Sequence, residues 1–200
     1  MRCVVIDVDG VLCSWCQPFA KLLRQHGAEL RPFTDGEPDC WDWYQAYGAD
    51  YWAVDAALAH TAQVPDWWRR LPVHADMTPA ACDALRYLTR RTEAYAVTAR
   101  PVGARLATNQ WLQQTLGVYD LPAVLTLRRK VQALVALEPA IIIEDRLSTL
   151  QAYRGSIPDL GLPPATLILV NRPYNQGDRT GLTVVESTGE ALDVALAEGR

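Results

Sequence analysis

The sequence predicts a doubly wound α/β protein with a mostly parallel sheet and a small helical cap inserted after the first strand. Two observations support this prediction. From residue 78 onward, unbroken apolar runs alternate with segments of helical length, as in a parallel sheet that is covered on both faces. Between residues 17 and 76 this alternation stops, and aromatic residues accumulate instead. We therefore expect a core domain over 1–16 and 77–200 and a cap over 17–76.

Local signals define the elements of the core. Residues 4–12 read VVIDVDGVL, an apolar first strand that is closed by acids. Thr78 and Pro79 open a helix over 77–92, as an N-cap followed by proline in the first turn. Pro101 and Gly117 bound the next helix. The remaining helices are expected at 128–139, 147–155 and 188–199, and the later strands at 93–98, 122–127, 140–146, 165–171 and, at the sheet edge, 182–187.

The inserted segment holds five of the seven tryptophans. They are Trp41, Trp43, Trp52, Trp67 and Trp68, with Tyr44, Tyr47 and Tyr51 among them. A module of about sixty residues needs large side chains to form a core, which is one interpretation of these aromatics. The other is that one or two of them stack on a flat ligand ring. Exposed aromatics could also form a homodimer contact.

Composition narrows the class of partner. Half of the 200 residues are apolar, and the net charge of -4 comes without runs of like charge. This balance argues against a nucleic-acid groove and against an anionic membrane surface. The N-terminus lacks the pattern of a signal peptide, and no stretch has the length of a membrane span. We expect a cytoplasmic protein whose partner is a small molecule, with no nucleic acid and no membrane.

The cysteines are odd in number and scattered, which favours reduced thiols. They are Cys3, Cys13, Cys16, Cys40 and Cys82. Cys13 and Cys16 nevertheless have the spacing of a redox motif. A zinc site would need further cysteines or histidines nearby, and the three histidines lie far along the chain. The sequence therefore leaves three roles open for these cysteines. Structural thiols are favoured, followed by a thiol-disulfide pair and then by a metal site.

Polar residues follow several of the predicted strands. Asp7 and Asp9 end the first strand, where an unpaired carboxylate in a dry environment would be costly. Thr98 and Asp145 end two later strands, and Lys130 begins a helix that follows another. Ligands of such sheets bind outside the carboxyl ends of the strands, near the switch in strand order. We therefore expect these side chains to converge.

These residues resemble the motifs of a known family. Residues 7–11, Asp-Val-Asp-Gly-Val, resemble the first motif of the haloacid dehalogenase-like (HAD) superfamily. Thr98, Lys130 and the pair Glu144 and Asp145 agree in order with its remaining motifs. The resemblance covers the chain outside the inserted segment, which sits where the family has a type 1 helical cap. It implies the HAD-like fold and an enzyme of phosphoryl transfer.

The resemblance also implies roles for the acids. Asp7 would be the nucleophile that forms an aspartyl-phosphate, and Asp9 would be the general acid and base. Mg²⁺ would be held by Asp7, by the backbone carbonyl of Asp9 and by Asp145, with Glu144 acting directly or through water. The alternative for Asp145 is an N-cap of the following helix.

Four further residues would bind the phosphate. The hydroxyl of Thr98 and the backbone amide of Ala99 precede a helix start, where an anion is favoured. Lys130 would neutralise the phosphate as a compact cation, unless it is simply solvated. Arg100 either lies near the phosphate or belongs to a strand-to-helix turn.

Within the superfamily, the chain is most similar to the 5'(3')-deoxyribonucleotidase group. The shared features are IDVDGVL, VTARP, IIEDR and a late NRPYN at residues 171–175. This resemblance implies hydrolysis of a nucleoside monophosphate, in particular a deoxyribonucleotide, with cap aromatics stacked on the base. The second motif reads TAR instead of TSP, which leaves the substrate preference open. The alternatives are a phosphatase for another small phosphometabolite, a nucleic-acid end phosphatase, and a thiol-disulfide protein that uses Cys13 and Cys16.

Overall fold

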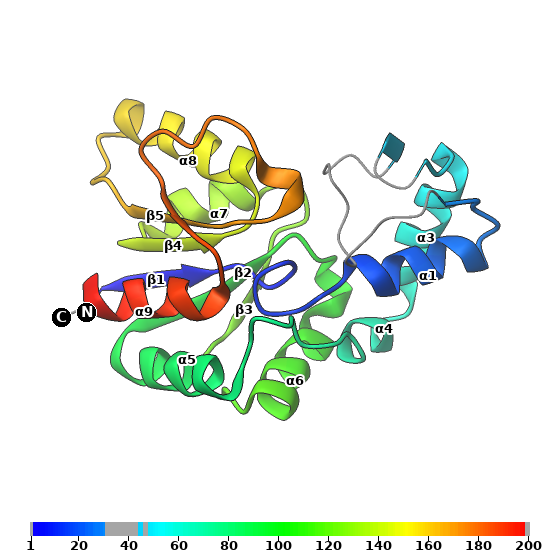
Figure 1. The fold of residues 1–200 in the computed structure, drawn as a ribbon, viewed down its shortest axis with the longest axis horizontal. Coiled ribbons are helices and arrows are strands. Elements are labelled where there is room, and N and C mark those ends of the chain that lie inside the picture. Colours follow the sequence, from blue (N-terminus) through cyan, green and yellow to red (C-terminus); the bar gives the residue numbers. More distant parts are fainter. Residues whose placement is uncertain (1, 31–43, 46–47, 199–200) are drawn as a thin grey trace.

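A six-stranded, all-parallel sheet forms the centre of the molecule (Figure 1). The computed structural model describes residues 2–30, 44–45 and 48–198. The strand order is β3-β2-β1-β4-β5-β6, with helices on both faces, so the predicted doubly wound α/β fold is confirmed. The strands are β1 (Cys3–Ile6), β2 (Glu93–Thr98), β3 (Ala123–Leu125), β4 (Ile141–Glu144), β5 (Thr166–Val170) and β6 (Thr183–Val185).

Two layers of helices cover the sheet (Figure 1). Helices α5 (Pro79–Arg91), α6 (Arg105–Leu116) and α9 (Thr188–Glu198) lie on one face, and α7 (Lys130–Leu137) and α8 (Leu147–Leu160) lie on the other. Val4 and Ile6 of β1 belong to the hydrophobic cluster on the first face, whereas Val5 belongs to the cluster on the second. Successive strand residues point to opposite faces. Burial on both faces therefore explains why the strand sequences are apolar without interruption.

Strand β1 lies where the chain order of the sheet reverses, between β2 and β4. Residue 4 pairs with Ala94 of β2 and with Ile141 of β4, so the three strands end near one another. The edge of a doubly wound sheet at such a switch point is the usual place for a ligand. The fold therefore puts the acids that follow β1 and β4 at one position.

Most predicted elements form, and one helix is longer than predicted. The Thr78 side chain accepts a hydrogen bond from the amide of Ala81 at 3.2 Å and so caps α5 as expected. We predicted that the helix after residue 146 would stop at Gly155, but α8 runs on to Leu160. The added turns contain Gly155 and Pro158, which are both unfavourable inside a helix, and they bury Ile157 in the cluster on the second face of the sheet.

Helices α1 (Cys16–Gln25), α3 (Tyr51–Gln63) and α4 (Asp66–Arg69) lie to one side of the sheet (Figure 1). The two connections that lead to them run side by side, because Cys13 and Val73 form a β-bridge and the Ser14 amide donates to the carbonyl of Pro72 at 3.0 Å. The assignment of residues 17–76 to a cap stays a prediction. None of the helices described here is long and apolar enough to cross a membrane.

The aromatic residues of this segment divide between core and surface. Trp68 is buried, whereas Trp52 is 78% exposed and Tyr51 is 57% exposed. An aromatic core is therefore not the role of the whole set. Trp41, Trp43 and Tyr47 lie outside the described residues.

Candidate active site

Asp7 is paired with Lys130 at the carboxyl end of β1. Its amide donates to the carbonyl of Ile143 at 2.9 Å, which continues the ladder between β1 and β4. Lys130 is the first residue of α7, and its Nζ lies 2.6 Å from Asp7 Oδ2 and 2.6 Å from Glu144 Oε2. The Lys130 side chain is only 11% exposed. The alternative of a solvated lysine is therefore wrong.

The three acids at the ends of β1 and β4 form a group that could hold a metal ion. One carboxylate oxygen from each of Asp7, Glu144 and Asp145 lies within 4.8 Å of the others, and all three residues are buried. Asp145 Oδ1 is buried and has no hydrogen-bond partner among the residues that the structure describes. A buried carboxylate oxygen without a donor is suited to a hard cation such as Mg²⁺. The residues therefore fit a divalent ion.

Asp145 does not cap the helix that follows it. The N-cap of α8 is Arg146, which makes no capping hydrogen bond through its side chain. The hydroxyl of Tyr174 donates to Asp145 Oδ2, and the amide of Arg146 donates to Glu144 Oε1 at 3.1 Å. The predicted alternative of a helix cap is therefore wrong. Glu144 is held by Lys130 and a backbone amide, whereas Asp145 keeps an oxygen available.

The acids carry more negative charge than Lys130 can balance. Burial, followed by the charge of Asp7, raises the pKa of Asp145 to about 7. The same two causes raise the pKa of Glu144 well above its usual range, against the opposing effect of Lys130. For Lys130, burial favours a lower pKa, but Asp7 and Glu144 outweigh it and raise the pKa. An added cation would stabilise the ionised carboxylates.

Asp9 forms a second cluster, with Arg100. Arg100 Nε lies 3.1 Å from Asp9 Oδ1 and 2.9 Å from Oδ2, and its Nη2 lies 2.7 Å from Oδ1. Thr98 Oγ1 donates to Oδ2 at 2.9 Å, and the Cys13 thiol donates to Oδ1 at 3.1 Å. Burial favours a higher pKa for Asp9, but Arg100 and these donors lower it.

The predicted phosphate-binding residues lie in different environments. Lys130 is beside the nucleophile candidate Asp7, as described. Thr98 is buried, and in this structure its hydroxyl donates to Asp9. Ala99 directly follows β2 and is exposed. The side chain of Arg100 is fully buried in an ion pair with Asp9, and its contact with the phosphate stays a prediction.

Gly10 allows the two acidic ends to approach each other. Its φ is +90°, and a Cβ there would lie 2.0 Å from Asp145 Oδ2 and 2.8 Å from the Tyr174 hydroxyl. Any larger residue would therefore displace the buried carboxylate. The glycine after the two aspartates is explained by this close contact.

Sequence reasoning gave no role to three residues that support the site. Arg172 donates to the carbonyl of Gly10 through Nε at 3.0 Å and Nη2 at 2.9 Å. Asn175 Nδ2 donates to the carbonyl of Asp145 at 2.7 Å, and Tyr174 contacts the Asp145 side chain. All three belong to NRPYN, which forms the turn after β5. The motif was noticed as a family likeness, and its contacts lie 29 or more positions away in the chain.

The cysteine pair lacks the features of a redox site. No disulfide joins Cys13 to Cys16, and both residues are buried. Burial, followed by the charge of Asp9, raises the pKa of the Cys13 thiol well above its usual range. Reactive cysteines have a lowered pKa and are partly exposed. The geometry therefore disfavours the thiol-disulfide alternative, and Cys40 lies outside the described residues.

Solved structures of similar fold extend over nearly the whole chain. Compared with protein-family models and with curated protein sequences, the chain has no match. A candidate β-phosphoglucomutase from Thermotoga maritima aligns with a TM-score of 0.54 and 18% identity, covering 99% of both chains. The chain shares this fold. A candidate haloacid dehalogenase-like hydrolase from Burkholderia xenovorans has a TM-score of 0.54, 15% identity, and coverage of 96% of this chain and 97% of its own. CbbY from Rhodobacter sphaeroides was solved in complex with phosphate and aligns with a TM-score of 0.54 and 13% identity. The alignment covers 96% of this chain and 99% of the CbbY chain.

Proposed function

We propose that this protein is a Mg²⁺-dependent phosphatase that hydrolyses a phosphate monoester through an aspartyl-phosphate on Asp7. The observation that carries the proposal is the arrangement at the end of β1, where Asp7 lies 2.6 Å from Lys130 and beside two further buried acids. A phosphate ester resists attack by a carboxylate unless its charge is neutralised and the reacting atoms are aligned. The site offers the nucleophile, a cation and a place for a second cation together.

Asp7 and Asp145 are the side chains that we propose to hold Mg²⁺, with the backbone carbonyl of Asp9 as the resemblance implies. Glu144 already accepts from Lys130 and from a backbone amide, so we assign it an indirect role. The free oxygen of Asp145 supports the direct role of that residue. When bound, the ion would neutralise negative charge on the phosphate.

The proposed reaction has two displacements at phosphorus. An oxygen of Asp7 attacks the phosphorus, the bond from phosphorus to the ester oxygen breaks, and the protonated form of Asp9 gives its proton to the departing alcohol, which leaves Asp9 in the ionised form that pairs with Arg100. Asp9 then takes a proton from a water molecule that attacks the same phosphorus, which releases inorganic phosphate and restores Asp7. Lys130 balances the charge on the phosphoryl oxygens, and the amide of Ala99 donates to them.

A nucleoside monophosphate, in particular a deoxyribonucleotide, is the substrate class that we propose. Exposed aromatic rings in the inserted segment support it, because Tyr44 and Tyr51 stack at 5.6 Å and Trp52 is largely exposed. Asp55 raises the pKa of the Tyr51 hydroxyl by accepting its hydrogen bond, and the charge of Arg128 opposes this.

A sugar phosphate is the second candidate. The Thermotoga maritima neighbour bears the name of an enzyme of phosphoglucose chemistry, and CbbY was solved with phosphate. Both names fit a small phosphate ester as the substrate. The two candidates share the chemistry at Asp7 and differ in the group that the inserted segment would contact.

Phosphate release across a substrate panel tests the proposal. The panel holds ribo- and deoxyribonucleoside monophosphates, sugar phosphates and 4-nitrophenyl phosphate, each with Mg²⁺ and with EDTA. We expect release that depends on Mg²⁺ and is highest with a deoxyribonucleotide. Preference for a sugar phosphate would reject the nucleotide substrate and keep the phosphatase.

The variant Asp7→Asn tests the covalent route. It should abolish phosphate release while the protein stays folded by circular dichroism, because an amide is a poor nucleophile of the same shape. Release at the wild-type rate by this variant would exclude an aspartyl-phosphate on Asp7. The variant with serine at both Cys13 and Cys16 separates the thiol-disulfide alternative, since a phosphatase keeps its phosphate release.

A further inference from the structure

Arg100 is a fully buried cation that touches Asp9 and no other carboxylate among the described residues. Its Nε and Nη2 both donate to Asp9, Nη2 also lies 3.0 Å from Cys13 Sγ, and Nη1 donates to Thr108 Oγ1 at 3.1 Å. The side chain has 0% exposure, whereas that of Asp9 has 16%. Each of the three guanidinium nitrogens is thus engaged inside the protein, and none is directed to solvent.

Two tryptophan rings lie close to the guanidinium of Arg100. The Arg100 guanidinium carbon lies 4.8 Å from the ring centroid of Trp68 and 5.9 Å from that of Trp111. Such contacts attract a cation to the ring face. Trp68 belongs to α4 and Trp111 to α6, so Arg100 lies where these two helices meet.

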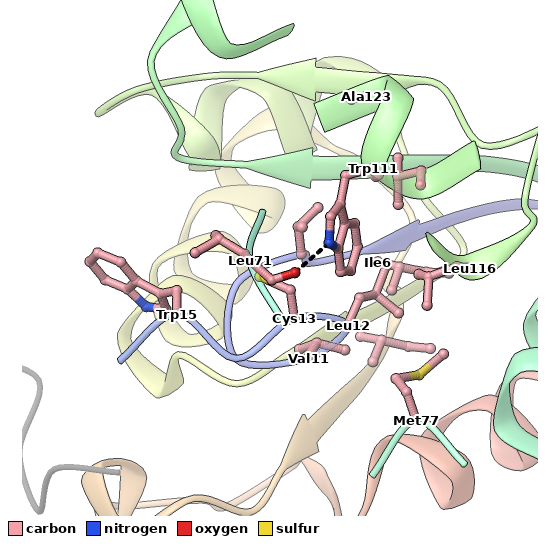
Figure 2. Close-up of a cluster of buried hydrophobic side chains, with 14 of the residues drawn as sticks. Ile6, Val11, Leu12, Cys13, Trp15, Leu71, Met77, Trp111, Leu116 and Ala123 are labelled. Carbon is pink, nitrogen blue, oxygen red and sulfur yellow. Dashed lines mark hydrogen bonds between the residues drawn. The ribbon is translucent and has the colours of Figure 1, made fainter. Parts of the chain in front are cut away.

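The indole N–H groups of both tryptophans donate hydrogen bonds to backbone carbonyls of the inserted segment. Trp68 Nε1 donates to the carbonyl of Thr61 in α3 at 2.9 Å. Trp111 Nε1 donates to the carbonyl of Leu71 at 2.7 Å, in the connection that returns from α4 to the core. Figure 2 shows this second bond beside Cys13 and Leu12, in the loop that follows Asp9. A chain of direct contacts thus joins α3 to the Asp9 carboxylate.

We infer that Arg100 is a positioning residue for the general acid and base Asp9, and that Trp68 fixes Arg100 in turn. The inference rests on the proposed phosphatase, because it assigns Asp9 the proton transfers of that reaction. Two guanidinium nitrogens, Nε and Nη2, donate to the Asp9 carboxylate and so fix its orientation relative to the end of β1. General acid and base catalysis depends on that orientation, since the proton must pass over a hydrogen-bond distance. The contact with Trp68 connects this orientation to the position of the inserted segment.

The esters that test this role differ in their need for a proton. 4-Nitrophenolate is weakly basic and leaves without one, whereas an alkoxide must be protonated as it departs. The value of kcat/KM covers all steps up to release of the alcohol. The ratio of kcat/KM for 4-nitrophenyl phosphate to that for the best alkyl phosphate of the panel therefore measures proton donation. The inhibition constant of inorganic phosphate measures the binding of the phosphoryl group separately.

In Arg100→Met we expect this ratio to rise at least about tenfold, because a misplaced acid forfeits part of the roughly 10²- to 10⁴-fold that such catalysis contributes. The inhibition constant of inorganic phosphate should change less than about twofold, since all three guanidinium nitrogens of Arg100 are engaged inside the protein. Arg100→Lys keeps the positive charge but lacks the paired N–H donors of the guanidinium. Its ratio should therefore lie between those of the wild type and Arg100→Met.

Further variants keep the test decisive if Arg100→Met does not fold. Trp68→Leu leaves no unpaired charge and should raise the ratio, whereas Trp68→Phe keeps a ring and should restore it. Arg70→Met is the matched control. Arg70 directly follows α4, pairs with Asp66 of that helix and has a side chain that is 77% exposed. Its ratio should equal that of the wild type.

Three results would overturn the inference. An equal fall of kcat/KM for both esters in the Arg100 and Trp68 variants would make their role structural. A raised inhibition constant of inorganic phosphate in Arg100→Lys would make Arg100 a phosphate ligand. If the wild type hydrolyses neither ester with Mg²⁺, the phosphatase itself is rejected and the inference falls with it, whereas the first two results leave the phosphatase standing.

Discussion

The unbalanced acids make the metal-free protein sensitive to pH. The pKa of Asp145 is about 7 in the folded state against its ordinary value of 3.8, chiefly because of burial and then because of Asp7. Between these values the folded state holds a proton that the unfolded state releases, so the free energy of unfolding falls as the pH rises. About three pKa units correspond to roughly 4 kcal/mol, lost by about pH 8. The raised pKa of Glu144 acts in the same direction.

Urea unfolding followed by tryptophan fluorescence, at several values between about pH 5 and pH 8, measures this loss. In EDTA the free energy of unfolding of the wild type should decline over that range. Mg²⁺ binds the ionised carboxylates, so its stabilising effect should grow as the pH rises. The lowered pKa of Asp9 gives a stabilisation that is constant over this window and is lost only below the ordinary carboxyl range.

Asp145→Asn is the control that isolates the carboxylate. Every other side chain is the same in the two proteins, so the difference in slope in EDTA reports the titration of Asp145 together with its effect on the pKa of Glu144. The variant should show the smaller decline and lose most of the stabilisation by Mg²⁺. Equal slopes in the two proteins, or a wild type that gains stability relative to the variant toward pH 8, would refute the reasoning.

Two further predictions concern the contacts at the ends of the strands. Lys130→Met leaves two buried carboxylates without their cation and should lower the free energy of unfolding by about 3–5 kcal/mol in Mg²⁺-free urea titrations, while Arg129→Met, at an exposed neighbour, should change it little. A decrease that is equal in the two variants would contradict the buried ion pair. Gly10→Ala should cost about 2 kcal/mol more than Gly27→Ala, because both have positive φ but only the first places its Cβ against Asp145. Similar losses in the two alanine variants would show that backbone strain alone matters at residue 10.

The sheet was predictable because its signals are local. Continuous apolar runs identify strands that are buried on both faces, and Thr78 with Pro79 marks a helix start whatever the rest of the chain does. The extent of α8 was not predictable in this way. Its continuation past Gly155 depends on the burial of Ile157, which no local pattern records.

The sequence by itself determined which acids would lie at the carboxyl ends of the strands, because strand ends can be read from the pattern and parallel strands end at one edge. Only the tertiary structure decided the partner of each side chain. Arg100 and Asp9 are 91 positions apart, and Arg172 and Gly10 are 162 apart. Such pairs depend on how far each strand extends past its neighbour and on which rotamer reaches across.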